Sequence, residues 1–146
     1  MVSILFLTLL LGWGFICSCD LCNKEAVENN VETYETYKNL KMQIEITTIL
    51  TNPTIGNTKR QISCYKEMYK LAKEKNVPRS FIIHTILSPG FKAAIYGYKL
   101  ATKSNKILMA DDFRKECDIF FTAGEKLSKI VGISNWKKYH NFENSI

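Results

Sequence analysis

Cysteine is the residue type whose chemistry this sequence most clearly offers. Cys19 and Cys22 form a C-x-x-C pair near the N-terminus, whereas Cys64 and Cys117 stand alone in the chain. A zinc site needs a second close pair of ligands, which neither the lone cysteines nor the two histidines supply. A thioredoxin-like redox motif needs a preceding strand and a βαβ context. We therefore predict no metal, no cofactor and no redox catalysis here, and expect these four cysteines to form structural disulfides.

An uncharged apolar stretch opens the chain and indicates export. Residues 2–16 carry no charge and lead into small residues, which is the pattern of a secretory signal peptide. The stretch of about 15 residues is shorter than the roughly 20 that a membrane span requires. We predict that residues 1–18 are a cleavable signal peptide, with an uncleaved anchor or a buried core helix as alternatives. A cut after Ser18 leaves four cysteines, whereas a cut after Cys19 leaves an odd number.

Secretion would place these cysteines in an oxidising compartment, where disulfides persist. Cys64 and Cys117 each lie about two turns from the predicted start of a helix. If both helices start at the same end of a bundle, the two cysteines share one height, so Cys64–Cys117 is the simplest pairing. Cys19 and Cys22 would then pair locally or lie together near the other end. The competing pairings tie the start of the mature chain to Cys64 and Cys117.

Other residue types give only weak signs of catalysis. His84 lies in an apolar run and would need a polar partner to act as a base, and a half-buried core histidine is the alternative. Asp111 and Asp112 point apart on a helix, which suits a helix start better than acid–base chemistry. The sequence holds no G-x-S-x-G, H-E-x-x-H, P-loop or G-x-G-x-x-G motif. We therefore expect a non-enzymatic protein, with a secreted hydrolase as the least favoured class.

Helical periodicity runs through the chain and must position these side chains. Apolar residues recur every three or four positions with lysine and glutamate between them, as in amphipathic helices. The pattern predicts an all-α, disulfide-stabilised bundle of four to five amphipathic helices after the signal peptide. The predicted helices cover residues 20–50, 58–75, 78–87, 88–103 and 110–131.

Helix signals also divide the chain into parts. Ser88 followed by a proline indicates a helix start, and Gly132 is the expected C-cap of the last helix. The apolar run 81–87 should be a buried helix, with a strand as the alternative. We predict one helical domain over 19–135 and a flexible, loosely held C-terminal tail over 136–146.

The chain is basic, because 20 lysine and arginine residues outnumber 14 aspartate and glutamate residues, for a net charge of +6. The basic residues are spread over the predicted polar faces of the helices and do not cluster with exposed aromatic residues. This dispersion argues against nucleic acid as a partner. The net charge still favours a weak attraction to anionic surfaces.

Aromatic residues are the most informative remaining feature, with eight phenylalanines and seven tyrosines in the chain. Tyrosines and phenylalanines that point inward from several helices could enclose a small apolar ligand, and a glycine among them would leave space. Ordinary core packing is the alternative. The candidate pocket residues are Tyr65, Tyr69, His84, Tyr98, Phe121 and Gly124.

These observations together favour a secreted, non-enzymatic binding protein. One form of this hypothesis is a carrier of a small hydrophobic ligand. The alternative is a secreted effector, such as a toxin, a salivary or venom factor or a cytokine-like signal, that acts on an extracellular protein or membrane. The effector hypothesis predicts an exposed apolar patch rimmed by lysines.

Overall fold

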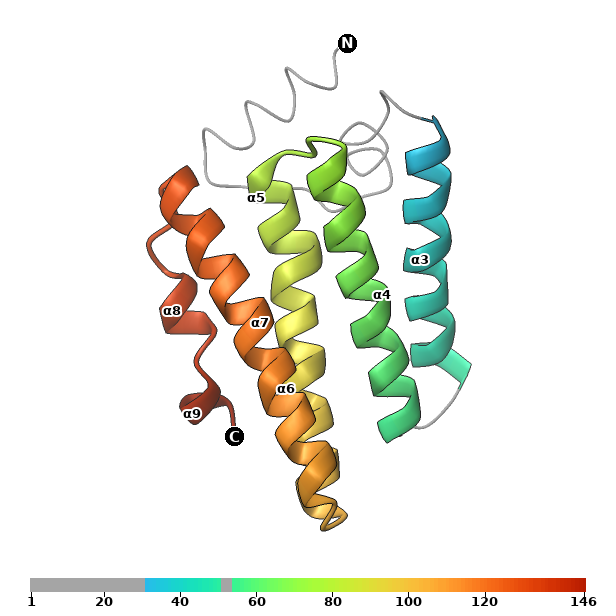
Figure 1. Ribbon diagram of the computed structural model, residues 1–146, viewed down its shortest axis with the longest axis vertical. Helices are drawn as coiled ribbons and strands as arrows, with labels where there is room; N and C mark the ends of the chain where they lie inside the picture. Colours follow the sequence, from blue (N-terminus) through green and yellow to red (C-terminus); the bar gives the residue numbers. More distant parts are fainter. Residues whose placement is uncertain (1–30, 51–53) are drawn as a thin grey trace.

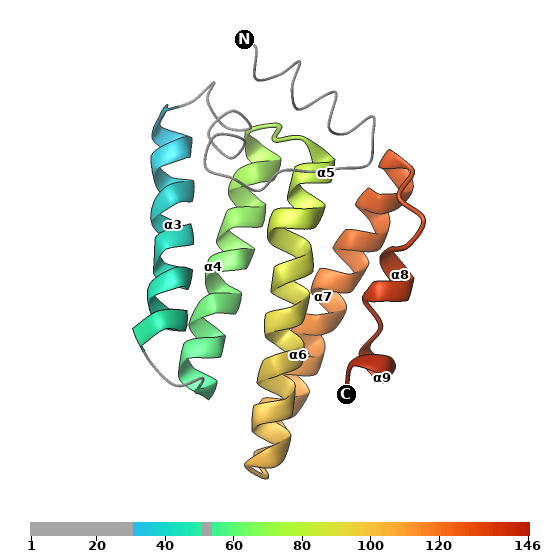
Figure 2. The ribbon, with the colours of Figure 1, turned by 180° about the vertical axis from the view of Figure 1, so that it is seen from behind.

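Four long helices lie side by side in the computed structural model, which describes residues 31–50 and 54–146 (Figure 1). They are α3 (Val31–Leu50), α4 (Ile55–Glu74), α6 (Ser88–Lys103) and α7 (Ile107–Val131). Helix α3 packs on α4, α4 packs on α6, and α6 packs on α7, an order that is also clear from behind (Figure 2). The described residues contain no strand, so the predicted all-α bundle is confirmed.

Helix α4 begins three residues before the predicted start because a threonine caps it. The side-chain oxygen of Thr54 accepts a hydrogen bond from the backbone N–H of Asn57 at 3.1 Å. The Thr58 hydroxyl donates to the carbonyl oxygen of Thr54 at 2.8 Å. Such a cap satisfies amide groups that the first turn of a helix leaves without partners. At the other end, Asn76 adopts a positive φ of 55° and turns the chain away.

The two helices predicted on either side of Ser88 are one continuous helical run. Helix α5 (Arg79–Ile82) leads into the π-helical turn η1 (Ile83–Leu87), which leads directly into α6. Pro89 has no N–H, and in an α-helix its ring would meet the carbonyl group of Thr85 four residues earlier. The wider π-helical turn accommodates the proline within the run. The predicted break at Ser88 is therefore wrong, and the strand alternative for residues 81–87 is wrong as well.

The core lies where α4, η1, α6 and α7 meet. Two glycines on α6 receive two phenylalanine rings from α7: Gly90 faces Phe120 and Gly97 faces Phe113. A Cβ atom at either glycine would overlap the facing ring, so these glycines allow α6 and α7 to approach closely. The largest fully buried side chains belong to Phe81, Phe120, Met68, Ile83, Ile86, Leu87 and Cys117.

The chain reverses after α7 and returns along the bundle. Gly132 ends α7 in the left-handed conformation, with φ of 81°, and confirms the predicted C-cap. Two short helices follow, α8 (Trp136–Tyr139) and α9 (Phe142–Ser145). They lie beside α7 in both views (Figures 1 and 2). The segment predicted to be a loosely held tail is thus packed against the bundle, because Trp136 is only 3% exposed.

Several predictions fall on residues outside the described ranges. These are the signal peptide over 1–18, Cys19 and Cys22, and the first part of the helix predicted over 20–50. Among the residues that are described, none of the helices has both the length and the apolar character needed to cross a bilayer.

Candidate functional site

The two cysteines within the described residues, Cys64 and Cys117, are free in this structure, so the predicted Cys64–Cys117 disulfide is not formed there. Cys64 and Cys117 lie at about the same level along the bundle, as predicted, because the nearby side chains of Lys66 and Glu116 form an ion pair of 3.2 Å between α4 and α7. Their directions differ. The Cys64 thiol lies toward α3 and donates to Oε1 of Gln43 at 3.6 Å, whereas Cys117 lies in the core. Since α4 and α7 both pack mainly on α6, the two thiols face different neighbours.

Burial sets the chemistry of both thiols. It raises the pKa of Cys117 to about 12, and the carboxylate of Asp118 adds to this increase. Burial also raises the pKa of Cys64, although the nearby Arg60 opposes the shift. Because the thiolate is the reactive form of cysteine, both residues are poor nucleophiles near neutral pH.

The six predicted pocket residues lie on different elements of the described bundle. Tyr65 and Tyr69 lie half-buried on α4, and the ammonium group of Lys73 lies 4.5 Å from the centre of the Tyr69 ring. His84 is exposed on η1. Tyr98 lies half-buried on α6 and packs edge-on against Phe142 of α9, with ring centres 4.8 Å apart.

The space beside Gly124 is filled by the chain itself. A Cβ atom on Gly124 would overlap the indole ring of Trp136. The indole N–H donates to the carbonyl oxygen of Phe121 at 3.1 Å, and the Phe121 ring lies 6.5 Å from the indole ring. Two of the predicted pocket residues therefore form a slot for a tryptophan of the same chain.

A serine–histidine pair that no sequence motif connects holds this tryptophan in place. Nε2 of His140 lies 2.7 Å from the Ser88 hydroxyl oxygen, and Nδ1 lies 3.0 Å from the carbonyl oxygen of Trp136. A carbonyl oxygen can only accept, so Nδ1 donates and a neutral Nε2 accepts from Ser88. The imidazole stacks on the indole, with ring centres 3.7 Å apart. We call Ser88, Trp136 and His140 the C-terminal latch.

Ser88 and His140 of the latch are arranged like a nucleophile and its general base, but their surroundings do not suit acyl transfer. The backbone N–H of Ser88 is already bonded to the carbonyl oxygen of Ile83, and Pro89 has no N–H. The two amides nearest the hydroxyl therefore cannot stabilise an oxyanion. Burial lowers the pKa of His140, and Lys92 and His84 lower it further, although the hydrogen bond to the Trp136 carbonyl oxygen opposes the shift. A lowered pKa favours the neutral ring, which suits a structural hydrogen bond.

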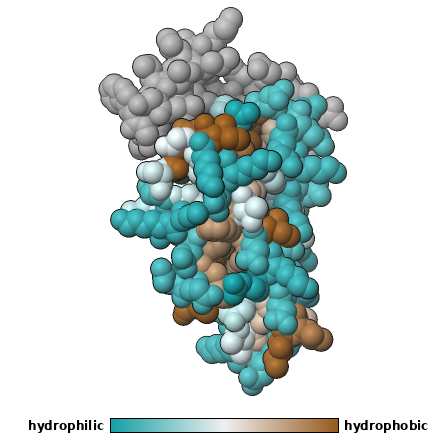
Figure 3. Space-filling model, turned by 60° about the vertical axis from the view of Figure 1, so that its left-hand side comes forward, coloured by the Kyte–Doolittle hydropathy of each residue, from teal (hydrophilic) through white to brown (hydrophobic). Residues whose placement is uncertain are grey.

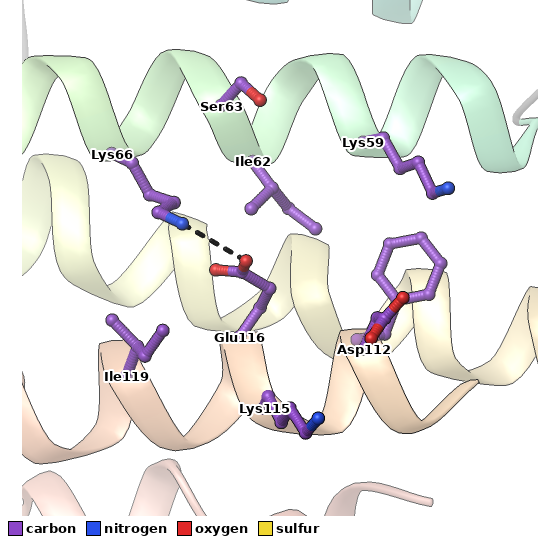
Figure 4. A pocket seen from close by; sticks show the side chains of 9 residues that line it. Lys59, Ile62, Ser63, Lys66, Asp112, Lys115, Glu116 and Ile119 are labelled. Atoms are coloured by element: carbon purple, nitrogen blue, oxygen red, sulfur yellow. Dashed lines mark hydrogen bonds and ion pairs between the residues drawn. The ribbon is translucent and has the colours of Figure 1, made fainter. Parts of the chain in front are cut away.

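A groove lined by charged, polar and apolar side chains lies between α4 and α7. Its first section holds about 450 Å³ and is shown in Figure 4. Side chains from α4 and α7 point toward one another across it, and the Lys66–Glu116 ion pair spans it. Ile62, Phe113 and Ile119 supply its apolar surface. The remaining residues that line the first section are Lys59, Ser63, Asp112 and Lys115.

A second section lies further along α7, where the end of α4, residues 76–78 and α5 face it, and holds about 560 Å³. Three cationic side chains line it, those of Lys73, Arg79 and Lys126, and no acidic side chain does. Its apolar surface comes from Ala72, Val77, Pro78, Ile82, Leu127 and Ile130. We refer to both sections together as the lysine-lined groove.

The charge of the groove is positive and largely uncompensated. Lys66 is paired with Glu116, whereas Lys59, Lys115 and Lys126 form no ion pair within residues 31–50 and 54–146. Six lysine and arginine side chains against two carboxylates leave the lining with a charge of +4. Such a rim attracts anionic groups.

Helix α7 carries a row of exposed apolar side chains, of which Ile119 and Ile130 line the groove and Leu108 lies beyond the residues that line it. Leu108, Ile119 and Ile130 are 81%, 49% and 53% exposed. They are spaced by 11 residues, which is about three turns, so they lie on one side of the helix. On the α7 side of the molecule, hydrophobic side chains stand out separately among hydrophilic ones (Figure 3). We call these three residues the α7 ridge.

Within the described part of the chain, no cluster of three or more histidine, cysteine, aspartate or glutamate side chains could hold a metal ion. Comparison of the sequence and structure with protein-family models, curated proteins and solved structures found no match. The site must therefore be interpreted from its own residues.

Proposed function

We propose that this protein is a secreted, non-enzymatic binding protein that acts on an extracellular protein through the lysine-lined groove. The observation that carries the proposal is the combination of an apolar floor and an uncompensated cationic rim along two helices. Exposed apolar surface rimmed by charge is typical of interaction sites. The secreted part of the proposal is supported by the apolar leader over residues 2–16.

The groove supports binding of a partner at the surface better than the interior of the bundle supports binding of an enclosed ligand. The spaces beside Gly90, Gly97 and Gly124 are occupied by Phe120, Phe113 and Trp136. These positions are where the helices could have left room for an enclosed ligand. The rings instead complete the core, as close packing of protein interiors requires.

A carrier of a small apolar ligand is the second candidate function. The observation that favours it is the size of the two groove sections, about 450 and 560 Å³. These volumes fall within the range of roughly 300–1,000 Å³ that small-molecule sites occupy. In this form the ligand would lie in the groove and not among the tyrosines of the core.

An anionic apolar dye tests the groove directly. We would titrate the protein with 1-anilinonaphthalene-8-sulfonate and compare the groove variant (Lys59→Glu, Lys115→Glu, Lys126→Glu) with a control variant (Lys99→Glu, Lys103→Glu, Lys106→Glu). Both variants change the net charge equally, and the control lysines are exposed outside the groove. We expect saturable binding that only the groove variant weakens. Equal weakening in both variants would contradict the proposal.

Two further measurements separate the alternatives. A neutral lipophilic dye, N-phenyl-1-naphthylamine, should bind at one site per chain if the protein is a carrier, and charge reversal should then matter little. Expression with the native leader should release a product cleaved after Ser18 into the medium. A full-length product that stays inside the cell would contradict the secreted part of the proposal.

A further inference from the structure

We infer that the lysine-lined groove and the α7 ridge bind an acidic amphipathic helix of a partner protein. The inference rests on the proposed function and names the chemistry of the partner. It follows from three properties of the surface, namely the spacing of its apolar side chains, the spacing of its lysines, and the openness of the groove.

The apolar spacing fits a helix. Leu108, Ile119 and Ile130 form a nearly straight row over 22 residues of α7, which is about 33 Å. Amphipathic helices bind grooves by laying one apolar face along them, with anchors that recur at helical spacing. Ile62 and Ile82 supply apolar surface on the floor of the first and second sections. A partner helix of about 22 residues would cover the whole row.

The lysine spacing fits acidic residues beside that apolar face. On α4, Lys59, Lys66 and Lys73 recur every seven residues and span about 21 Å of the groove edge. On α7, Lys115 and Lys126 are 11 residues apart, each one turn before an isoleucine of the ridge. A helix laid over the groove, above the Lys66–Glu116 ion pair that spans the first section, would therefore meet cations on both sides. Glutamates at i, i+7 and i+14 match the α4 edge, because a seven-residue repeat keeps side chains on one face.

The open shape of the groove favours a helix over a small ligand. Small-molecule sites bury about 70–90% of their ligand. Both groove sections are partly open to solvent. An amphipathic helix needs to bury only one face, so it can gain affinity from a surface that would leave a small molecule half solvated.

Designed peptides test the inference on the whole mature protein. The probe is a fluorescein-labelled 22-residue helix with leucines on one face and glutamates at i, i+7 and i+14 beside them. One control peptide carries lysine in place of glutamate, and another has the same composition with the glutamates moved to the opposite face. Fluorescence anisotropy should show saturable 1:1 binding of the acidic probe, at least tenfold weaker binding of both controls, and loss of affinity with added salt.

Matched variants locate the binding. The groove variant defined above should bind the probe at least tenfold more weakly, because three attractive charges become repulsive. Ile119→Ser with Ile130→Ser should weaken it roughly ten- to thirtyfold through lost apolar burial. The control for the second pair is Met42→Ser with Ile46→Ser, since these two residues are exposed to a similar degree on α3. Circular dichroism of each variant must match the unaltered protein, since a misfolded variant would also lose binding.

The outcomes separate this inference from the proposed function. If the anionic dye depends on the groove lysines but no acidic helix binds, the inference is wrong and the proposed function stands. If neither dye binding nor peptide binding depends on the groove lysines, both the inference and the proposed function are wrong. Groove-dependent binding to phosphatidylserine vesicles without peptide binding would instead assign the groove to a membrane. Self-association in sedimentation that Ile119→Ser abolishes would assign it to a second copy of the chain.

Discussion

Replacing Trp136 with alanine should destabilise the whole bundle, although this residue lies only ten positions from the C-terminus. The indole is 3% exposed, fills the space beside Gly124, and donates a hydrogen bond to the carbonyl oxygen of Phe121. Truncating such a buried tryptophan costs about 3–5 kcal/mol in other proteins. We expect a loss near the lower end, about 3 kcal/mol, because the segment can undock and thereby limit the loss.

The assay is thermal unfolding followed by circular dichroism. For a domain of this size, about 3 kcal/mol corresponds to a decrease in Tm of roughly 10 °C. Tyr139→Ala is the matched control, because Tyr139 belongs to the same short helix but is 64% exposed. Its replacement should change stability by less than about 0.5 kcal/mol. If both variants melt within 2 °C of the unaltered protein, the latch is not docked in the folded state and Trp136 does not stabilise the bundle.

Three further predictions test other parts of the structure. Gly97→Ala should cost about 1–3 kcal/mol of unfolding free energy because the new Cβ overlaps a buried ring. Gly56→Ala should be neutral or stabilising, because its new Cβ would make only an ordinary contact, 4.0 Å from the Thr54 hydroxyl oxygen. Burial lowers the folded-state pKa of His140, so the unfolded state binds more protons than the folded state. The free energy of unfolding should therefore fall as pH decreases below about 6.5. His140→Gln should flatten this pH dependence, and an unchanged slope would contradict the prediction. Iodoacetamide should modify Cys64 and Cys117 in denaturant without a reductant, as mass spectrometry would show, whereas a peptide crosslinked between the two would contradict the free thiols.

The main helices could be predicted because their signals are local. The apolar positions of α7, among them Phe113, Cys117 and Phe120, follow one helical face and form the buried side of the helix as expected. Gly132 was correctly identified as the cap because few other residues adopt a positive φ there. The break at Ser88 was wrong because proline suits the first turn of a helix but is also tolerated after a π-helical turn.

The contacts of the latch and the direction of the cysteines could not be predicted, because both depend on tertiary packing. Ser88 and His140 are separated by 52 residues, and only the reversal after α7 brings them together. The height of Cys64 and Cys117 followed from helix geometry, but their directions depend on how each helix is rotated about its axis. That rotation is set by which neighbours pack around α4 and α7.

The groove could not be predicted as a site because its lysines looked like the ordinary polar faces of helices. One signal in the sequence was available, the 11-residue spacing of Leu108, Ile119 and Ile130. A row of apolar residues on the polar side of a helix is unusual, since a helix packed by one face normally exposes polar residues on the other. Only the structure relates this row to the lysines of α4.

Methyl NMR of isoleucine-labelled protein can show whether the groove between α4 and α7 is the binding surface. When the acidic helical peptide is added, we predict chemical-shift changes at Ile62, Ile119 and Ile130, which line the groove. The methyl signals of Ile46 on α3 and of Ile86 in the core should remain unchanged. Shifts centred on Ile46, or no shift in any of the groove methyls at saturating peptide, would contradict the account.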